Sequence, residues 1–141
     1  WGLESGPDGD LSIEMALKDP TRFVLKPQRE GGGNNYFGNE VAVKLNAIKN
    51  SKERESYILM ELIRAPKIPN YILMPNKSVA QSNFKPLDIL FEFGVFGAIV
   101  GDQNQVMHSR EAGHNFRSKV FGINEGGVMA GFGALDSPFL Y

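Results

Sequence analysis

Cysteine is absent from this 141-residue chain. Its absence excludes disulfide scaffolds, cysteine–zinc sites and thiol catalysis. Histidine is scarce as well, because only His108 and His114 occur, and two histidines cannot form a three-histidine metal centre. We expect both to be surface or hydrogen-bonding residues.

Charge of one sign is not in excess. Fifteen basic residues face sixteen acidic ones, which leaves a net charge of −1, and no run of lysine or arginine is longer than a pair. We therefore expect neither a nucleic acid nor a membrane as a partner. The longest apolar stretch, residues 93–100, is far shorter than the roughly 20 residues of a membrane span. We interpret it as a buried strand.

The composition is that of a folded domain. Hydrophobic residues make up 42% of the chain and aromatic residues 11%, which is enough to build a core for one domain. Residues 1–10 are rich in glycine and proline and predict a loop. Apolar residues near helical spacing then predict a helix at residues 11–18, and residues 22–26 have the β-branched and aromatic character of a short strand.

A second helix is expected after residue 38. Asn39 is its predicted N-cap, and Val41, Leu45 and Ile48 recur on one face. Strands are predicted at residues 57–63, 71–74, 89–100 and 106–108, with prolines between them. This uneven mixture predicts an α+β fold with a largely antiparallel sheet and helices on one face.

One segment combines a cation, a carboxylate, three glycines and two amides. Consecutive glycines let backbone N–H groups form a concave anion site, to which a lysine adds a full positive charge. A carboxylate beside a polyphosphate requires a divalent cation, and Mg²⁺ typically takes one or two carboxylates plus substrate phosphates. The segment reads Lys26-Pro27-Gln28-Arg29-Glu30-Gly31-Gly32-Gly33-Asn34-Asn35.

Common nucleotide motifs do not account for this segment. It lacks the Gly-Lys-Ser/Thr ending of a Walker A loop, and the chain has no Gly-x-Gly-x-x-Gly. The alternative is that the triple glycine is only a flexible surface turn. The lysine, arginine, glutamate and paired asparagines around it favour a phosphate and Mg²⁺ site.

The segment resembles the glycine-rich loop of eukaryotic glutathione synthetases, which are ATP-grasp ligases. Further blocks of the chain match that family in order, at residues 56–61, 92–97, 117–119, 126–131 and 135–138. The resemblance covers only the C-terminal part of the family's polypeptide. It implies that residues 1–141 are the C-terminal ATP-grasp part of a larger, cytoplasmic protein, although the chain starts at Trp1 and a secretion signal upstream would not be visible.

The resemblance implies an ATP-dependent ligase that joins γ-glutamylcysteine to glycine or another amino-acid acceptor, with ATP as co-substrate and Mg²⁺ as cofactor. The implied partners are the N-terminal part of the same protein and a second copy in a homodimer. Lys26, Arg117 and Lys119 are the implied catalytic residues, Glu30 the metal ligand, and Arg117, Val128 and Met129 the substrate contacts. The implied ATP contacts are Lys26, Pro27, Gln28, Arg29, Glu30, Gly31, Gly32, Gly33, Asn34, Asn35, Phe37, Met60, Glu61, Leu62, Ile63, Glu92, Lys119 and Glu125.

Without the resemblance, several of these residues have plainer interpretations. Residues 58–63 are an ordinary buried strand, and Glu92 is a carboxylate that faces an edge. Arg117 and Lys119 alternate on a predicted strand and so point to the same side, which suits either a shared anionic ligand or two solvated charges.

The chain also departs from the family's pattern. Leu62 stands where lysine or arginine is frequent, Phe37 replaces a tyrosine, and Met129 replaces an alanine of the loop that closes over the acceptor. Methionine is larger and flexible there. Such divergence keeps a second hypothesis open, a binding or effector protein that retains the fold without ordinary catalysis.

Overall fold

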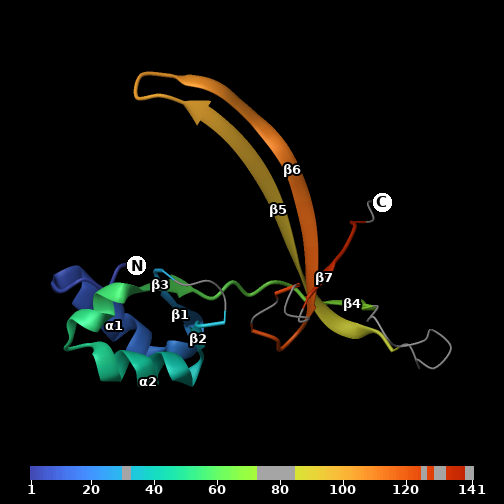
Figure 1. Ribbon diagram of the computed structural model, residues 1–141. Helices are drawn as coiled ribbons and strands as arrows, with labels where there is room; N and C mark the ends of the chain where they lie inside the picture. The colour runs from blue at the N-terminus through green and yellow to red at the C-terminus, as the bar shows by residue number, and fades with distance from the viewer. Residues whose placement is uncertain (30–32, 73–84, 125–126, 129–132, 139–141) are drawn as a thin grey trace. The chain divides into compact units, whose positions relative to one another are not determined.

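The structure is a computed structural model that describes residues 1–29, 33–72, 85–124, 127–128 and 133–138 (Figure 1). The chain divides into two compact units, Trp1–Arg64 and Ala65–Tyr141. In chain order the elements are α1 (Pro7–Lys18), η1 (Pro20–Arg22), β1 (Phe23–Pro27), β2 (Tyr36–Phe37), α2 (Asn39–Ile48), η2 (Lys52–Ser56), β3 (Tyr57–Glu61), β4 (Ile68–Asn70), β5 (Leu87–Gly101), β6 (Val106–Val120) and β7 (Ala134–Leu135), where η is a 3₁₀-helix.

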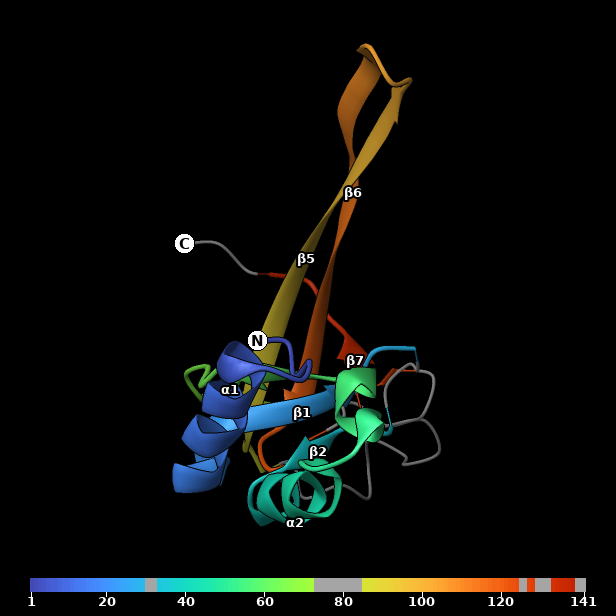
Figure 2. The same cartoon turned by 90° about the vertical axis from the view of Figure 1, so that its left-hand side faces the viewer.

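The first unit contains an antiparallel sheet of order β2-β1-β3, with both α-helices beside it (Figure 2). The N-terminal residues extend this sheet past β3. The backbone N–H of Leu59 donates to the Trp1 carbonyl over 2.9 Å, the backbone nitrogen of Trp1 donates to the Leu59 carbonyl over 2.6 Å, and Gly2 bridges to Ile58. The predicted loop at residues 1–10 is therefore wrong, because part of it is sheet.

Helix α1 begins four residues earlier than the sequence predicts. Pro7 occupies its first turn, a position where the missing N–H of proline costs nothing. The glycine- and proline-rich pattern predicts a loop at this position instead. Ile13 and Ala16 of this helix are buried against Leu25 and Leu59, which come from one face of the sheet.

Helix α2 agrees with its predicted apolar face, since Val41, Leu45 and Ile48 are all buried. Asn39 is not the N-cap, however. Gly38 precedes the helix with φ of +54°, a left-handed conformation that glycine adopts at low cost, and Asn39 is the first helical residue.

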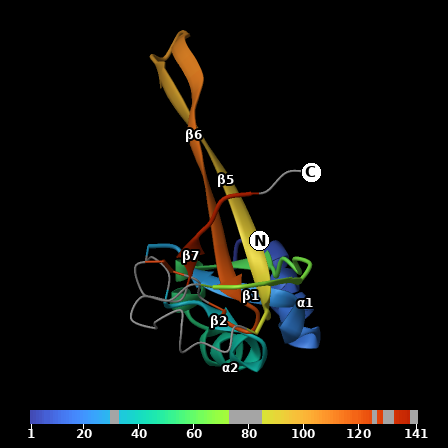
Figure 3. The ribbon, with the colours of Figure 1, turned by 90° about the vertical axis from the view of Figure 1, so that its right-hand side faces the viewer.

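The second unit is an antiparallel sheet of order β4-β5-β6-β7. Its main feature is the ribbon formed by β5 and β6, which pair from Ile89 opposite Val120 to Gly101 opposite Val106. The flanking strands pair only with the end of the ribbon where β5 begins and β6 ends, which we call its base. Strand β4 pairs there with residues 87–89 and β7 with residues 117–118. The two long strands wind about each other (Figure 3), as twisted two-stranded ribbons do.

Three strand predictions need correction in this unit. Strand β6 runs twelve residues beyond the predicted end at His108. The prediction of a strand at residues 71–74 is wrong for Tyr71 and Ile72, which are not in a strand. Residues 73–74 lie outside the described residues. The stretch from Phe93 to Val100 is a strand but is not buried, since the exposed fractions of Phe93 and Ile99 are 57% and 69%.

The α+β class with antiparallel sheets is confirmed. In the described part of the chain, no helix has the length and apolar character needed to cross a bilayer.

Candidate functional site

Strand register gathers predicted site residues on one face of the first sheet. Side chains alternate between faces along a strand, and Leu25 and Leu59 point into the core. Lys26, the next residue of β1, and Met60, the next residue of β3, therefore face the opposite side. Phe37 of β2 shares that side, because it pairs with the residue that precedes Leu25. The helix-free face thus carries a cation, an aromatic ring and a thioether.

The glycine-rich segment leaves the end of this sheet. Gln28, the first residue of the segment after the end of β1, is held by two hydrogen bonds. Its side-chain amide donates to the Glu55 carbonyl over 2.7 Å, and its backbone N–H donates to the Ser56 carbonyl over 2.9 Å. Gly33 has φ of +98°, which agrees with the need for glycine there. Arg29 and Asn34 are exposed and Asn35 is half-buried. Glu30, Gly31 and Gly32 lie outside the described residues.

Four consecutive ATP contacts implied by the resemblance, residues 60–63, lie at the end of β3 and just after it. A groove of about 400 Å³ is lined there by Arg22, Glu61, Leu62, Ile63 and Arg64. The Leu62 N–H donates to the Arg22 carbonyl over 2.8 Å, so this backbone donor is already used within the sheet. The Ile63 side chain is 79% exposed and can cover an apolar ligand face.

An ion pair closes one side of the groove. The Arg22 guanidinium lies 2.9 Å from the Glu61 carboxylate. The hydrogen bond from Arg22, together with its charge, lowers the pKa of Glu61 below its ordinary value. Sequence reasoning missed Arg22 and Arg64, because nothing in the spacing of these two arginines marks them as groove residues.

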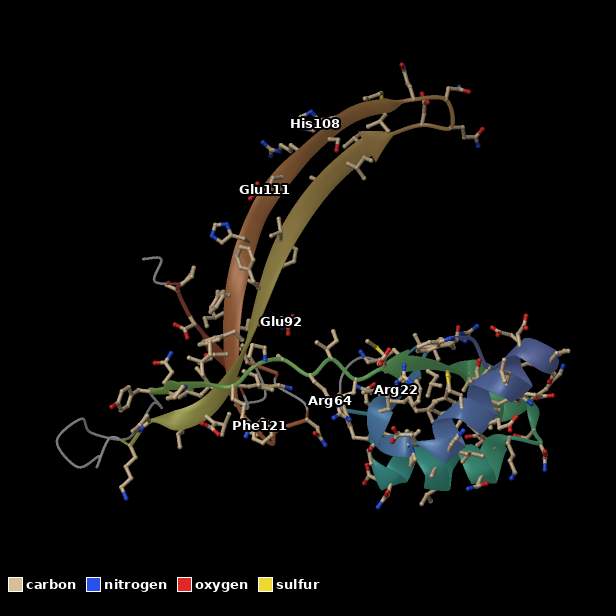
Figure 4. All side chains as sticks on the ribbon, turned by 180° about the vertical axis from the view of Figure 1, so that it is seen from behind. Arg22, Arg64, Glu92, His108, Glu111 and Phe121 are labelled. Atoms are coloured by element: carbon tan, nitrogen blue, oxygen red, sulfur yellow. The ribbon has the colours of Figure 1, made fainter. Side chains whose placement is uncertain are left out.

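In the second unit, three predicted site residues share one face of the ribbon. Glu92 pairs with Arg117 across the two strands, and Lys119 follows two residues later on the same face, as predicted for the two basic residues. Glu92 projects from the part of the ribbon nearest its base (Figure 4). Its carboxylate forms an ion pair with Arg117, and the Lys119 ammonium donates to the Asn124 carbonyl over 2.9 Å.

Arg117 retains unused hydrogen-bonding capacity. Its Nε atom is buried and has no hydrogen-bond partner among the described residues, which is unusual for a buried polar atom. The structure brings Arg117 to Glu92, an arrangement that the sequence did not predict. His108 and His114 are exposed, and His114 lies with its ring centroid 5.7 Å from that of Phe93.

The predicted acceptor segment is only partly described. Val128 is half-buried, whereas Glu125 and Met129 lie outside the described residues. In the part of the chain that the structure covers, no group of three or more histidine or acidic side chains is placed to hold a metal ion.

A family model described as the ATP-binding domain of eukaryotic glutathione synthase matches residues 1–140. The chain belongs to this family. It is 41% identical to glutathione synthetase of Xenopus laevis over 140 residues, which cover 99% of the chain and 28% of that protein. It is also 38% identical over 143 residues to the chloroplastic glutathione synthetase of Arabidopsis thaliana, of which 25% is covered.

A solved structure agrees with these matches. A glutathione synthetase-like effector from Globodera pallida, in its apo form, superposes with a TM-score of 0.60 and 29% identity over 90% of the chain and 26% of that protein. The fold is therefore ATP-grasp-like, as the resemblance implied. The chain spans 28% or less of each of these three relatives.

Proposed function

We propose that residues 1–141 are the C-terminal, ATP-binding part of a ligase of the glutathione synthetase type. The observation that carries this proposal is the register of β1, β2 and β3, which aligns Lys26, Phe37 and Met60 on the sheet face opposite the helices, beside the glycine-rich segment. A cation, a glycine-rich backbone and apolar side chains are what a nucleotide triphosphate requires. The family match over residues 1–140 supports ATP as the ligand.

The proposed reaction has two steps. The γ-phosphate of ATP passes to the cysteinyl carboxylate of γ-glutamylcysteine, which gives ADP and an acyl phosphate. The amine of glycine or a related acceptor then attacks the acyl carbon, phosphate leaves, and an amide bond forms with loss of a proton from the amine. Positioned cations are the main protein contribution to such phosphoryl transfer.

We assign the individual roles from the family resemblance, and the chemistry of the side chains fits them. Lys26 and Lys119 bind ATP phosphates, while the backbone of the glycine-rich segment supplies N–H donors. Arg117 binds a substrate carboxylate, for which its planar, bidentate guanidinium is well shaped. Glu30 and the phosphates form an oxygen donor set that suits Mg²⁺, and the bound ion supplies charge neutralisation during phosphoryl transfer.

The exposed apolar side chains of the ribbon support a proposal about the rest of the protein. A two-stranded ribbon is marginally stable alone in water, and Phe93, Val95 and Ile99 are all more than half exposed. We propose that an upstream part of the same protein covers this surface, and that the complete protein forms a homodimer.

The decisive experiment uses the complete protein with its upstream part. ADP release and product mass spectrometry are measured with ATP, Mg²⁺, γ-glutamylcysteine and a panel of amine acceptors. Formation of an amide product coupled to ADP release supports the ligase. ATP binding without any product from any acceptor would contradict ligase activity and favour the alternative below.

The alternative is a binding or effector protein, or a ligase of altered specificity, and the likeness to an effector from Globodera pallida favours it. Met129 distinguishes the two ligase cases. A change in side-chain size within an apolar pocket is worth about 1 to 3 kcal/mol of discrimination. Met129→Ala should therefore shift the ratio of kcat/KM at least several-fold toward glycine. An unchanged ratio would show that Met129 does not contact the acceptor.

A further inference from the structure

Both ends of the glycine-rich segment are attached to the same short stretch of chain, η2 and the residue after it. At the first end, Gln28 is hydrogen-bonded to the carbonyls of Glu55 and Ser56, as described above. At the second end, Tyr36 directly follows the segment and begins β2. Its ring lies 6.1 Å from the ring of Tyr57, edge to face, at an interplanar angle of 61°.

A lysine from α2 completes this second attachment. The Lys44 ammonium lies 5.7 Å from the centroid of the Tyr36 ring and 5.1 Å from that of Tyr57. It also donates to the Glu53 carboxylate over 2.6 Å. Glu53 belongs to η2, so the carboxylate holds the cation in place over both rings. We call Tyr36, Lys44, Glu53 and Tyr57 the lysine–tyrosine cluster.

The charge states favour this arrangement. The Lys44 side chain is only 20% exposed, and the hydrogen bond with Glu53 is the main cause that raises the pKa of Lys44 to about 12. Desolvation is the main cause that raises the pKa of Tyr36. At neutral pH the cluster therefore places a cation against the neutral Tyr36 ring, the condition for an attractive cation–π contact.

The 3₁₀-helix η2, which carries Glu53 of the cluster, is itself held in place. Arg54, in the middle of η2, is buried, donates to the Leu3 carbonyl over 2.7 Å and pairs with Asp10 over 2.6 Å. Its guanidinium also donates to the Lys49 carbonyl over 3.0 Å. Arg54 thus bonds η2 to both the N-terminal segment and α1. Contacts with η2 and Tyr57 therefore hold both ends of the glycine-rich segment against a fixed part of the unit.

We propose that Lys44 is a positioning residue for the phosphate-binding segment, whose end it fixes by clamping Tyr36 against Tyr57. This inference rests on the proposed function, in which the segment binds the phosphates of ATP. Lys44 does not itself contact the nucleotide in this proposal. Its loss should weaken recognition of the phosphates and leave recognition of the base unchanged.

The test compares Lys44→Met with the parent in the complete protein. Met keeps the apolar stem and removes the cation, Lys44→Arg restores a cation, and Lys18→Met removes an exposed lysine at the end of α1 as a matched control. Calorimetry measures the Kd of ATP and of adenosine. Hydrogen exchange with mass spectrometry measures residues 34–37 and, for comparison, residues 7–18 of α1.

We expect Lys44→Met to weaken ATP binding about 5- to 30-fold, the fold-change that one desolvated cation–π contact is worth. Adenosine affinity should not change, and exchange should accelerate at residues 34–37 but not in α1. Lys44→Arg should recover most of the ATP affinity, and Lys18→Met should behave like the parent.

Equal loss of ATP and adenosine affinity, or exchange that rises equally in α1, would overturn the proposal and leave Lys44 with only a general stabilising role. If Lys44→Met does not fold, Glu53→Gln, which removes the anchor of the cation, carries the same comparison. A parent protein that binds neither ligand would contradict the proposed function instead. The exchange measurement would still decide whether Lys44 positions the segment.

Discussion

Residues 1–64 and residues 65–141 differ in how many of their apolar side chains they bury. In the first unit two helices and the N-terminal segment cover one face of a short sheet, and Leu3, Leu25 and Leu45 are completely buried. In the second unit a much longer ribbon carries more apolar side chains than the unit can cover. Among the described residues, Ile89 is its one buried apolar side chain.

This contrast shows that longer strands do not necessarily bury more apolar side chains. The strands of the β5–β6 ribbon are fifteen residues each and those of the first sheet at most five, yet the shorter strands enclose the core. Burial of apolar area provides most of the favourable free energy of folding. We therefore expect the first unit to hold its structure without help and the ribbon to depend on a covering surface.

The most direct way to break this comparison is to truncate one apolar side chain in each unit of the 141-residue chain. Leu25→Ala should lower the free energy of unfolding by about 2 to 5 kcal/mol, because it leaves a cavity in a closed core. Ile99→Ala should change it by less than about 0.5 kcal/mol, because that side chain is already in water. Urea denaturation measures both, and equal effects would refute the contrast.

A second test concerns chemistry in the first unit. In the complete protein, Lys26→Met should remove a phosphate cation and Glu30→Gln a metal ligand, and each should lower ATP-dependent turnover by roughly 100-fold or more. Adenosine binding should survive, because neither side chain is assigned to the base. Lys18→Met is the control. Unchanged turnover in both variants would remove the glycine-rich segment from the phosphate and Mg²⁺ site.

The sequence predicted best what local patterns determine. Helix α2 was found because Val41, Leu45 and Ile48 repeat at helical spacing, and all three are buried. Strands β1 and β3 were found within two residues of their ends from their apolar and β-branched runs. The start of α1 was missed because Pro7 and Gly9 resemble loop residues, although proline is favoured in a first helical turn.

The ribbon was predicted poorly for a different reason. Residues 106–120 are mostly polar and do not alternate, so their strand conformation comes from pairing with β5 rather than from their own pattern. The apolar run at residues 93–100 is a strand, as predicted, but it is not buried. A hydrophobic run does not specify which part of the protein covers it. Likewise, the lysine–tyrosine cluster takes one side chain from each of four consecutive elements, β2, α2, η2 and β3, and it forms only when these elements pack together, so spacing alone could not reveal it.

A third test sharpens the comparison by adding the covering surface. Phe93→Ser should destabilise the complete protein by about 1.5 to 3 kcal/mol, the value of burying one large apolar side chain, but should hardly affect the 141-residue chain, in which Phe93 is 57% exposed. Leu11→Ser is the matched control, because Leu11 is 65% exposed on α1. If Phe93→Ser were equally silent in both proteins, that part of the ribbon would be a free surface.

The smallest effect compares one carboxylate from each unit. Arg22 lowers the pKa of Glu61 through a hydrogen bond and its charge, and the backbone N–H groups of Asn104 and Gln105, at 2.8 and 2.9 Å, lower the pKa of Asp102. Because both pKa values are lowered, each group stabilises the fold above its ordinary pKa of about 4, and this stability is lost as the pH falls through the folded-state value.

Both groups are exposed, so the losses should be small, but their causes differ. Screening by about 1 M salt should remove most of the Glu61 contribution, which depends on a charged partner, and leave most of the Asp102 contribution, which depends on hydrogen bonds to the backbone. Melting temperatures of the parent, Glu61→Gln and Asp102→Asn between about pH 5 and pH 3, with and without salt, measure this. The contribution of each carboxylate is the difference in melting temperature between the parent and its variant. If salt reduced the Glu61 and Asp102 contributions equally, Arg22 would not hold Glu61 through its charge.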